Sequence, residues 1–184
     1  MNIVLATQSP RRKELFKYIT SSFITVTSNV DERYSASLKP HEVVLHLSKI
    51  KAQSIYRDYP NDLIIGCDTI VSINDNILEK PQDANQAFEM LKLLSGNTHQ
   101  VMTGVTLIRG ETIDSFYSST DVSFYPLTNE EIHSYIKTKE PFDKAGAYGI
   151  QGYASKFVEK INGDYFTVMG LPVACIYQKI KALL

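Results

Sequence analysis

Cysteine is scarce in this sequence, whose 184 residues include only Cys67 and Cys175. The two lie far apart and lack the paired spacing of a metal site or a disulfide framework. We therefore expect free thiols and a reducing compartment, with a single disulfide between them as the alternative.

Long apolar runs are missing as well. No stretch approaches the roughly 18 consecutive apolar residues of a membrane span. At the N-terminus the apolar run Ile3–Ala6 comes before the charged residues, and it is too short for a signal peptide, in which the charges come first. We therefore expect a cytoplasmic protein without a membrane partner.

A net charge of either sign is absent too. Nineteen basic and twenty acidic residues leave a formal charge of -1. A chain this close to neutral has no global field to attract nucleic acid, so we expect no nucleic-acid partner. Any site for an anion must be built locally.

Three catalytic motifs cannot be found. The four histidines show no HExxH spacing, no serine has a GxSxG setting, and the phosphate loop of NTPases is missing. Ordinary globular composition, 43% apolar and 21% charged, predicts one domain over residues 1–184. No repeat of fixed period points to a solenoid.

Strand and helix signals alternate along the chain. Strands are expected at residues 3–6, 23–28, 63–67 with a second run to 73, 101–108, 113–124 and 157–161. Helices are expected to begin at Pro10, Pro40, Asp83, Thr128 and Pro172. Asn162-Gly163 predicts a hairpin turn leading into a strand at 165–169. This order predicts an α/β fold, a mixed twisted sheet with flanking helices.

The first helix begins with an unusual run of cations. Ser9 is a good N-cap and Pro10 a good first residue, but Arg11, Arg12 and Lys13 follow in the first turn. Positive charge is unfavourable at a helix N-terminus unless an anion is bound there. A phosphate site is one interpretation, and a solvated turn is the other. The first predicts that neutralising both arginines stabilises the empty protein and weakens binding.

Acidic residues follow two of the expected strands. Asp68 comes directly after the apolar run 63–67, so its carboxylate should lie at the carboxyl end of a strand, where it can hold a divalent metal or orient a water. The alternative is that Asp68 and Thr69 satisfy a turn. Asp31-Glu32 is either a second ligand group for a shared magnesium or a solvated loop. Lys49 and Lys51 are expected to point to solvent.

The segment Asp143–Gly152 holds three glycines with little bulk between them. Such a backbone can approach a ligand closely, and the Gln151 amide offers both a donor and an acceptor for a base edge. The alternative is a tight connection without a ligand. Lys80 is a lone lysine before Pro81, and the residues around it indicate little about its role.

Seven segments taken together resemble the Maf family, in the same order and from end to end. They are Ala6–Leu15, Lys51-Ala52, Gly66–Thr69, Glu79–Pro81, Leu94–Gly96, Asp143–Gly152 and Gly170–Pro172. The resemblance implies an elongated, two-lobed fold with a central cleft, like that of the inosine triphosphate pyrophosphatases (Ham1), and a homodimer. Cys67 departs from the family's usual alanine, a small-for-small change that should leave Asp68 in place.

The family hydrolyses nucleoside triphosphates to the monophosphate and pyrophosphate. The resemblance implies that Asp68 is the proton acceptor and that Glu32, Lys51 and Lys80 line the catalytic cleft. It also implies that Arg11, Thr69 and Gln151 set base specificity, in a combination similar to the dTTP and UTP branch.

Ser9 and Arg12 are expected to contact the triphosphate, and Mg²⁺ or Mn²⁺ is expected on Asp68 and Glu32. Modified pyrimidine nucleotides are further candidate substrates. The alternative function is a nucleotide-binding regulator of cell division and septum formation that acts through a protein partner.

Overall fold

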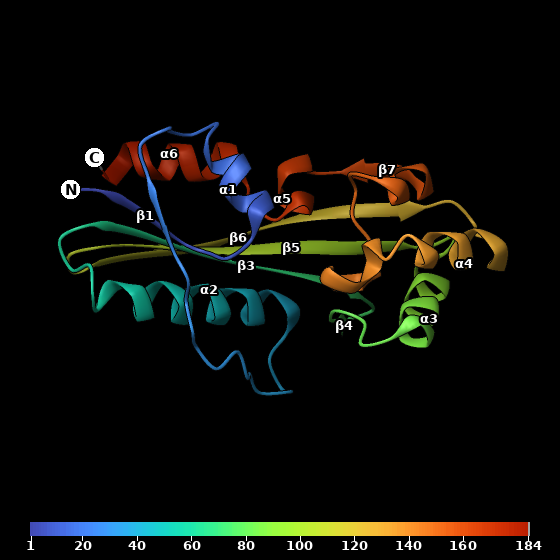
Figure 1. The fold of residues 1–184 in the computed structure, drawn as a ribbon. Coiled ribbons are helices and arrows are strands. Elements are labelled where there is room, and N and C mark those ends of the chain that lie inside the picture. Colours follow the sequence, from blue (N-terminus) through green and yellow to red (C-terminus); the bar gives the residue numbers. More distant parts are fainter. Residues whose placement is uncertain (184) are drawn as a thin grey trace. The chain divides into compact units, whose positions relative to one another are not determined.

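The computed structural model describes residues 1–183, which form a mixed seven-stranded sheet with helices. The strand order is β2-β1-β3-β5-β6-β7, and β4 pairs with β3 (Figure 1). The strands are β1 Ile3–Ala6, β2 Ile24–Val26, β3 Leu63–Ile73, β4 Asn76–Leu78, β5 Thr98–Arg109, β6 Thr112–Phe124 and β7 Val158–Asn162. The expected α/β fold with a mixed sheet is confirmed.

The helices begin close to the expected residues. They are α1 Pro10–Phe16, α2 Pro40–Tyr56, α3 Ala84–Leu94, α4 Asn129–Lys137, α5 Tyr165–Met169 and α6 Val173–Leu183, with short 3₁₀ segments η1 Glu140–Asp143, η2 Ala145–Ala147 and η3 Tyr153–Phe157. Ser9, Asp83 and Thr128 each cap a helix through a side-chain oxygen. Of the helices described, none is long and apolar enough to cross a membrane.

The chain forms two compact units. Among the described residues, the first consists of residues 1–69, 103–118 and 170–183, and the second of residues 70–102 and 119–169. The strands β3, β5 and β6 contribute residues to both units.

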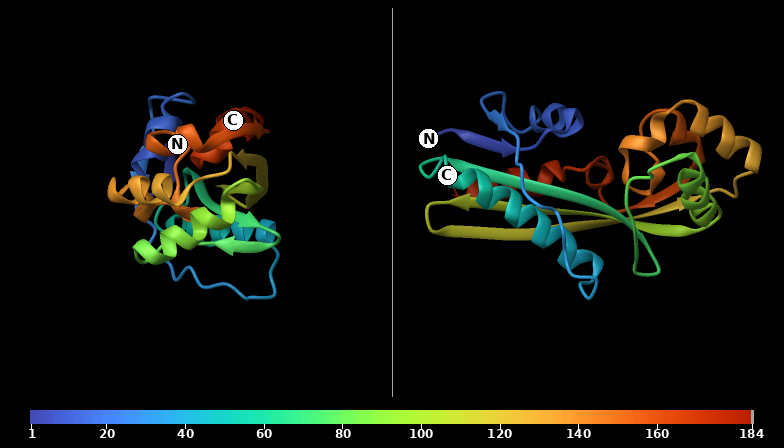
Figure 2. Two further views of the ribbon diagram at one scale, coloured as in Figure 1. Left: turned by 90° about the vertical axis from the view of Figure 1, so that its right-hand side faces the viewer. Right: turned by 60° about the horizontal axis from the view of Figure 1, so that its bottom comes forward.

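The first unit packs helices on both faces of its part of the sheet. α2 lies against one face, and α1 and α6 lie against the other (Figures 1 and 2). β1 pairs in parallel with β2 and with β3. The backbone of α2 lies very close to the sheet because β3 and β5 have glycine where the helix packs on them. A β-carbon at Gly66 would overlap the Ser48 carbonyl, and one at Gly104 would overlap the Val44 backbone.

The second unit has its own apolar core, in which α3 packs against α4 (Figure 2). Aromatic rings fill its centre. Phe124 contacts Tyr148 with ring centroids 4.8 Å apart, and Tyr135 contacts Phe157 at 5.3 Å. His99 is 1% exposed beside Phe124 and Tyr148.

One expected element is wrong. Asn162-Gly163 does not turn a hairpin, because residues 165–169 form helix α5 instead of a strand. The Asp164 carboxylate accepts hydrogen bonds from the backbone N–H and the hydroxyl of Thr167, both at 2.7 Å. This N-terminal cap starts a helix where the dipeptide alone indicated a turn between strands.

Candidate functional site

Asp68 lies inside β3, and not after it. The strand runs unbroken from Leu63 to Ile73, so the expectation of a break at Asp68 is wrong. The neighbouring strand β1, however, ends at Ala6, which pairs with Gly66. Asp68 therefore projects just beyond the carboxyl end of the parallel strands, the edge where α/β proteins bind ligands.

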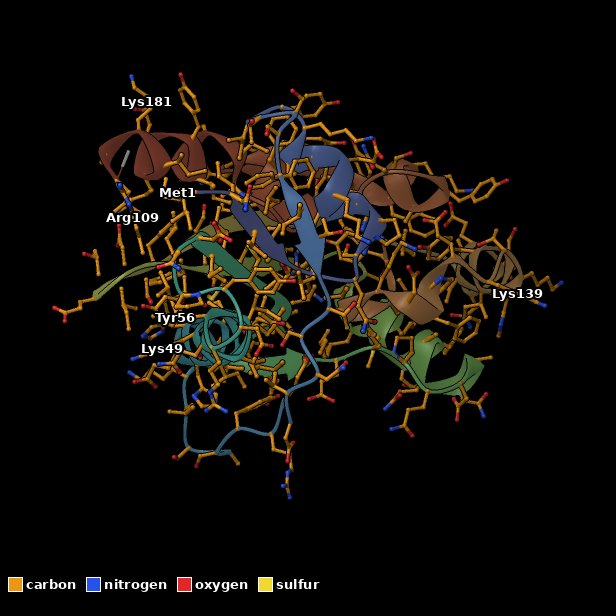
Figure 3. All side chains as sticks on the ribbon, turned by 60° about the vertical axis from the view of Figure 1, so that its left-hand side comes forward. Met1, Lys49, Tyr56, Arg109, Lys139 and Lys181 are labelled. Atoms are coloured by element: carbon orange, nitrogen blue, oxygen red, sulfur yellow. The ribbon has the colours of Figure 1, made fainter. Side chains whose placement is uncertain are left out.

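Lys51 joins Asp68 from helix α2. Its Nζ atom lies 2.5 Å from Oδ1 of Asp68 and 3.0 Å from Oε2 of Glu32. The Lys51 and Asp68 side chains are each 11% exposed, and that of Glu32 is 53% exposed. Lys51 was expected to point to solvent, and that expectation is wrong. Lys49, two residues earlier, is exposed as expected (Figure 3).

These three side chains leave groups available for a ligand. An ammonium has three N–H donors, so one remains on Lys51 after its bonds to the two carboxylates. Within residues 1–183 no hydrogen bond reaches Oδ2 of Asp68, while Lys51 occupies Oδ1. One carboxylate oxygen is thus fixed, and the other can accept a proton.

Arg12, on helix α1, forms hydrogen bonds with the residues directly before and after Asp68. Its Nη1 donates to the Cys67 carbonyl at 3.0 Å, and its Nη2 donates to the Thr69 hydroxyl at 2.8 Å. Its Nε donates to the Gly170 carbonyl at 2.8 Å. These contacts give Arg12 a structural role, and its expected contact with the triphosphate stays a prediction. Its remaining N–H groups can still meet a ligand.

Thr69 has a second hydroxyl partner. Its Oγ1 lies 2.9 Å from Oγ1 of Thr103. Because a guanidinium only donates, Thr69 accepts from Arg12, and its own proton is directed to Thr103 or to a ligand. Arg12 thereby fixes the direction in which Thr69 can donate.

Arg11 and Ser9 stand at the start of α1. The Arg11 side chain is half-buried. The Ser9 hydroxyl accepts the Arg12 backbone N–H at 3.4 Å, which is its role as N-cap. Their expected contacts with substrate stay predictions.

Both cysteines are free thiols, as expected. Cys67 is fully buried beside Asp68, and burial raises the pKa of its thiol to about 11. Cys67 thus remains protonated at neutral pH, which makes it a packing residue and not a nucleophile.

Asp68 and Glu32 are the two carboxylates that would hold a divalent metal. Both approach the same Lys51 nitrogen, so the ammonium occupies the point where they converge, and a metal would bind the oxygens that Lys51 leaves free. Asp68 would then act as a metal ligand instead of as the proton acceptor. Among residues 1–183 no group of three or more His, Cys, Asp or Glu side chains forms a complete metal site. Two carboxylates are nevertheless a usual protein contribution to Mg²⁺, which takes its other ligands from water and phosphates.

Two expected site residues belong to the second unit. Lys80 is exposed between β4 and α3, and Gln151 is exposed between η2 and η3. Both stay predicted site residues.

The glycines of the segment Asp143–Gly152 pack closely against other parts of this chain, and the expected approach to a ligand stays a prediction. Gly146 has a φ of 68° and lies against Val71, while Gly149 lies against the aliphatic chain of Lys144. Gly152 has a φ of 90° and lies against the Glu140 carboxylate. Glu140 was not singled out from the sequence, because no motif marks an acidic residue that contacts a turn twelve positions later.

The chain is similar to known proteins over nearly its whole length. A model of the family described as Maf-like protein matches residues 2–183. The dTTP/UTP pyrophosphatase of Carboxydothermus hydrogenoformans is 49% identical over 183 residues, which cover 98% of each chain. That of Bacillus cereus is 46% identical over 179 residues, covering 97% of this chain and 94% of the relative.

A solved structure, the Staphylococcus aureus Ham1 protein, is similar in fold. The TM-score is 0.58 at 11% identity, with 100% of both chains covered. The expected likeness to the Ham1 fold is confirmed.

Proposed function

Because the chain belongs to the Maf-like protein family, we propose that it hydrolyses dTTP and UTP to the nucleoside monophosphate and pyrophosphate. Relatives named dTTP/UTP pyrophosphatase, 46% and 49% identical over nearly the full length, support this substrate class. Modified pyrimidine triphosphates are further candidate substrates of the same site.

The observation that carries the proposal is the contact of Lys51 with both Asp68 and Glu32. Cleavage between the α and β phosphates needs a water directed at the α phosphorus and a group that takes its proton. Asp68 supplies that group through Oδ2, because Lys51 holds Oδ1 at 2.5 Å. The 11% exposure of the Asp68 side chain leaves access for a water.

Positive groups bind the phosphates and the pyrophosphate leaving group. Lys51 donates to the Asp68 carboxylate, and Arg12 donates to Cys67 and Thr69, the residues before and after Asp68. Such fixed donors stabilise charge that develops as the bond breaks. Lys80 and Arg11 are proposed to add positive charge, and Ser9 to add a hydroxyl contact.

We propose that Mg²⁺ or Mn²⁺ is held by Asp68 and Glu32. When bound, it would neutralise phosphate charge and lower the pKa of a coordinated water. EDTA should then abolish turnover, and adding back either metal should restore it.

Base specificity is assigned to Arg11, Thr69 and Gln151. Arg12 orients the Thr69 hydroxyl as a donor toward Thr103 or a ligand. The exposed Gln151 amide can pair with both a donor and an acceptor on a pyrimidine edge.

The test is product analysis with purified protein, Mg²⁺ and a panel of canonical and modified nucleotides. We expect pyrophosphate and the monophosphate in equal amounts from dTTP and UTP. Orthophosphate with a diphosphate product would contradict the proposal. Stoichiometric retention of nucleotide without turnover would instead support the regulator of cell division.

We further propose a cytoplasmic homodimer, on the basis of the two free thiols and the family resemblance. Light scattering on purified protein at several concentrations should give twice the chain mass of 20.7 kDa. A mass of one chain would contradict the dimer.

A further inference from the structure

The turn that carries Gln151 is held on both sides by two side chains, Tyr135 and Glu140. Gln151 itself is exposed, and within residues 1–183 its side-chain amide makes no hydrogen bond. The backbone of the turn is therefore restrained, while the amide at its tip is available to a ligand.

Glu140 fixes the far side of the turn. Its Oε2 accepts the backbone N–H of Tyr153 at 3.0 Å, and its Oε1 accepts the hydroxyl of Tyr135, also at 3.0 Å. Tyr153 lies two positions after Gln151. A carboxylate with both oxygens used in this way has one well-defined orientation.

Tyr135 fixes the near side. Its ring is 2% exposed in the core of the second unit. Burial, followed by the contact with Glu140, raises the pKa of Tyr135, while the nearby backbone N–H of Gly149, two positions before Gln151, acts in the opposite direction. The hydroxyl therefore stays protonated and donates to Glu140.

Gly152 shows how closely the carboxylate fits the turn. Its φ of 90° suits glycine, and a β-carbon there would lie only 2.5 Å from Oε2 of Glu140. The side chain of Glu140 thus occupies the space that the missing β-carbon leaves. If this segment were only a tight turn, glycine would be needed at position 152, but no carboxylate would be needed beside it.

We propose that Glu140 is a positioning residue for nucleobase recognition: with Tyr135 it restrains the backbone around Gln151 and so limits the positions from which the amide can reach a base. This inference rests on the proposed function, in which Gln151 reads the base. A fixed amide rejects a base with a different edge, because its donor or acceptor is then left unpaired. A mobile turn would let the amide reorient and accept other bases.

The principal test is Glu140→Gln, which keeps the size of the side chain but turns one acceptor oxygen into a donor. The charged acceptor is then lost from both contacts, and the bond to the Tyr135 hydroxyl must break or reverse its direction. We expect the ratio of kcat/KM for dTTP to that for dGTP to fall about tenfold, within the usual range for residues of one hydrogen-bonded network. For dTTP, KM should change more than kcat.

Glu159→Gln is the matched control. Glu159 is exposed on β7 in the same unit, so the substitution makes the same change of charge without touching the turn. The ratio of kcat/KM for dTTP to that for dGTP should be the same in Glu159→Gln as in the wild type. If a folded Glu140→Gln variant shows that same ratio, the proposal is overturned.

A double-mutant cycle separates positioning from a general structural effect. If Glu140 acts through Gln151, Glu140→Gln should cause no further loss of discrimination in a Gln151→Ala background. An equal loss in both backgrounds would contradict the proposal. Tyr135→Phe is the replacement test if Glu140→Gln fails to fold. It keeps the ring against Phe157, 5.3 Å away, and should also lower the ratio of kcat/KM for dTTP to that for dGTP.

Two measurements without turnover distinguish this proposal from the proposed function. Amide hydrogen exchange at Gly149 and Tyr153 should be faster in Glu140→Gln than in Glu159→Gln. Equilibrium binding should show a reduced preference for dTMP over dGMP. Absence of dTTP and UTP hydrolysis by the wild type would reject the proposed function. If Glu140→Gln leaves the amide exchange rates or the preference for dTMP over dGMP unchanged, the role of Glu140 is rejected.

Discussion

Lys51 contributes to the site because it is buried, and not only because it is charged. The Lys51 and Asp68 side chains are each 11% exposed, so the attraction between their charges is screened less than on the surface. Removing Lys51 would leave Asp68 and Glu32 close together without a counter-charge. The single residues of this site therefore act as a group.

Asp68→Asn tests the proposed proton acceptor. The amide keeps the size of the side chain but lacks a basic oxygen, so turnover of dTTP should fall at least about 100-fold, as is typical for a general base. Pyrophosphate release measures turnover, and a thermal melt checks the fold. Nearly normal turnover in a folded variant would return Asp68 to a purely structural role.

Arg12→Gln tests the contacts that join α1 to β3. The sequence alone predicted that neutralising the cations stabilises the empty protein. Arg12, however, donates to the Cys67 and Gly170 carbonyls, so we now expect the free energy of unfolding to fall by about 1.5–3 kcal/mol.

Urea denaturation without nucleotide is the measurement, and Lys13→Gln, which removes a cation from the same helical turn, is the matched control. Lys13→Gln should be less destabilising. Equal stability of the two variants would show that the Arg12 contacts contribute little.

Among the elements, α2 determines where Lys51 lies. It approaches the sheet closely only because Gly104 in β5 and Gly66 in β3 leave room for its backbone. Because protein interiors are close-packed, a side chain added at either glycine would shift the whole helix.

Gly104→Ala should therefore displace α2. The added β-carbon would overlap the Val44 backbone, and we expect a loss of about 1–3 kcal/mol in stability together with lower turnover. Gly110→Ala is the comparison: its φ of 55° strains an alanine, but a β-carbon there would meet nothing within 4 Å, so it should lower stability without lowering turnover. Unchanged turnover in a folded Gly104→Ala variant would show that the close approach of α2 does not determine the geometry of the site.

Elements with local signals could be predicted from the sequence. Ser9, Asp83 and Thr128 each accept the backbone N–H three positions later, so the chain encodes these helix starts locally. The Asn162-Gly163 prediction failed because the cap at Asp164 decides the conformation of the next five residues.

The site was predictable only in part. Asp68 and Glu32 stood out as carboxylates after apolar runs, and the resemblance supplied Lys51. The residues alone predicted a solvated Lys51, because its burial depends on how α2 packs on the sheet and not on helical periodicity. Glu140 escaped notice for a similar reason, since its partners belong to a separate loop.

At the scale of the whole molecule, His99 predicts acid sensitivity. Burial lowers its pKa from 6.5 to about 4, so the unfolded chain binds a proton below pH 6.5 that the folded protein does not. Stability should then fall as the pH drops from 6.5 to 4, by about 1.4 kcal/mol per pH unit and about 3 kcal/mol in all.

The measurement is the free energy of unfolding at several pH values, for the wild type and for His99→Gln. Glutamine can still bond the Tyr148 hydroxyl, which lies 2.7 Å from Nε2 of His99. The variant should show a slope that is smaller by about one proton. Identical slopes would mean that carboxylates alone account for the acid sensitivity.

The central claim is that a water near Asp68 attacks the α phosphorus of a pyrimidine triphosphate. It is tested most directly by hydrolysing dTTP in water enriched in ¹⁸O, with Mg²⁺, and locating the label by mass spectrometry. We predict one ¹⁸O atom in the thymidine monophosphate and none in the pyrophosphate. Label in the pyrophosphate, or in released orthophosphate, would contradict the account.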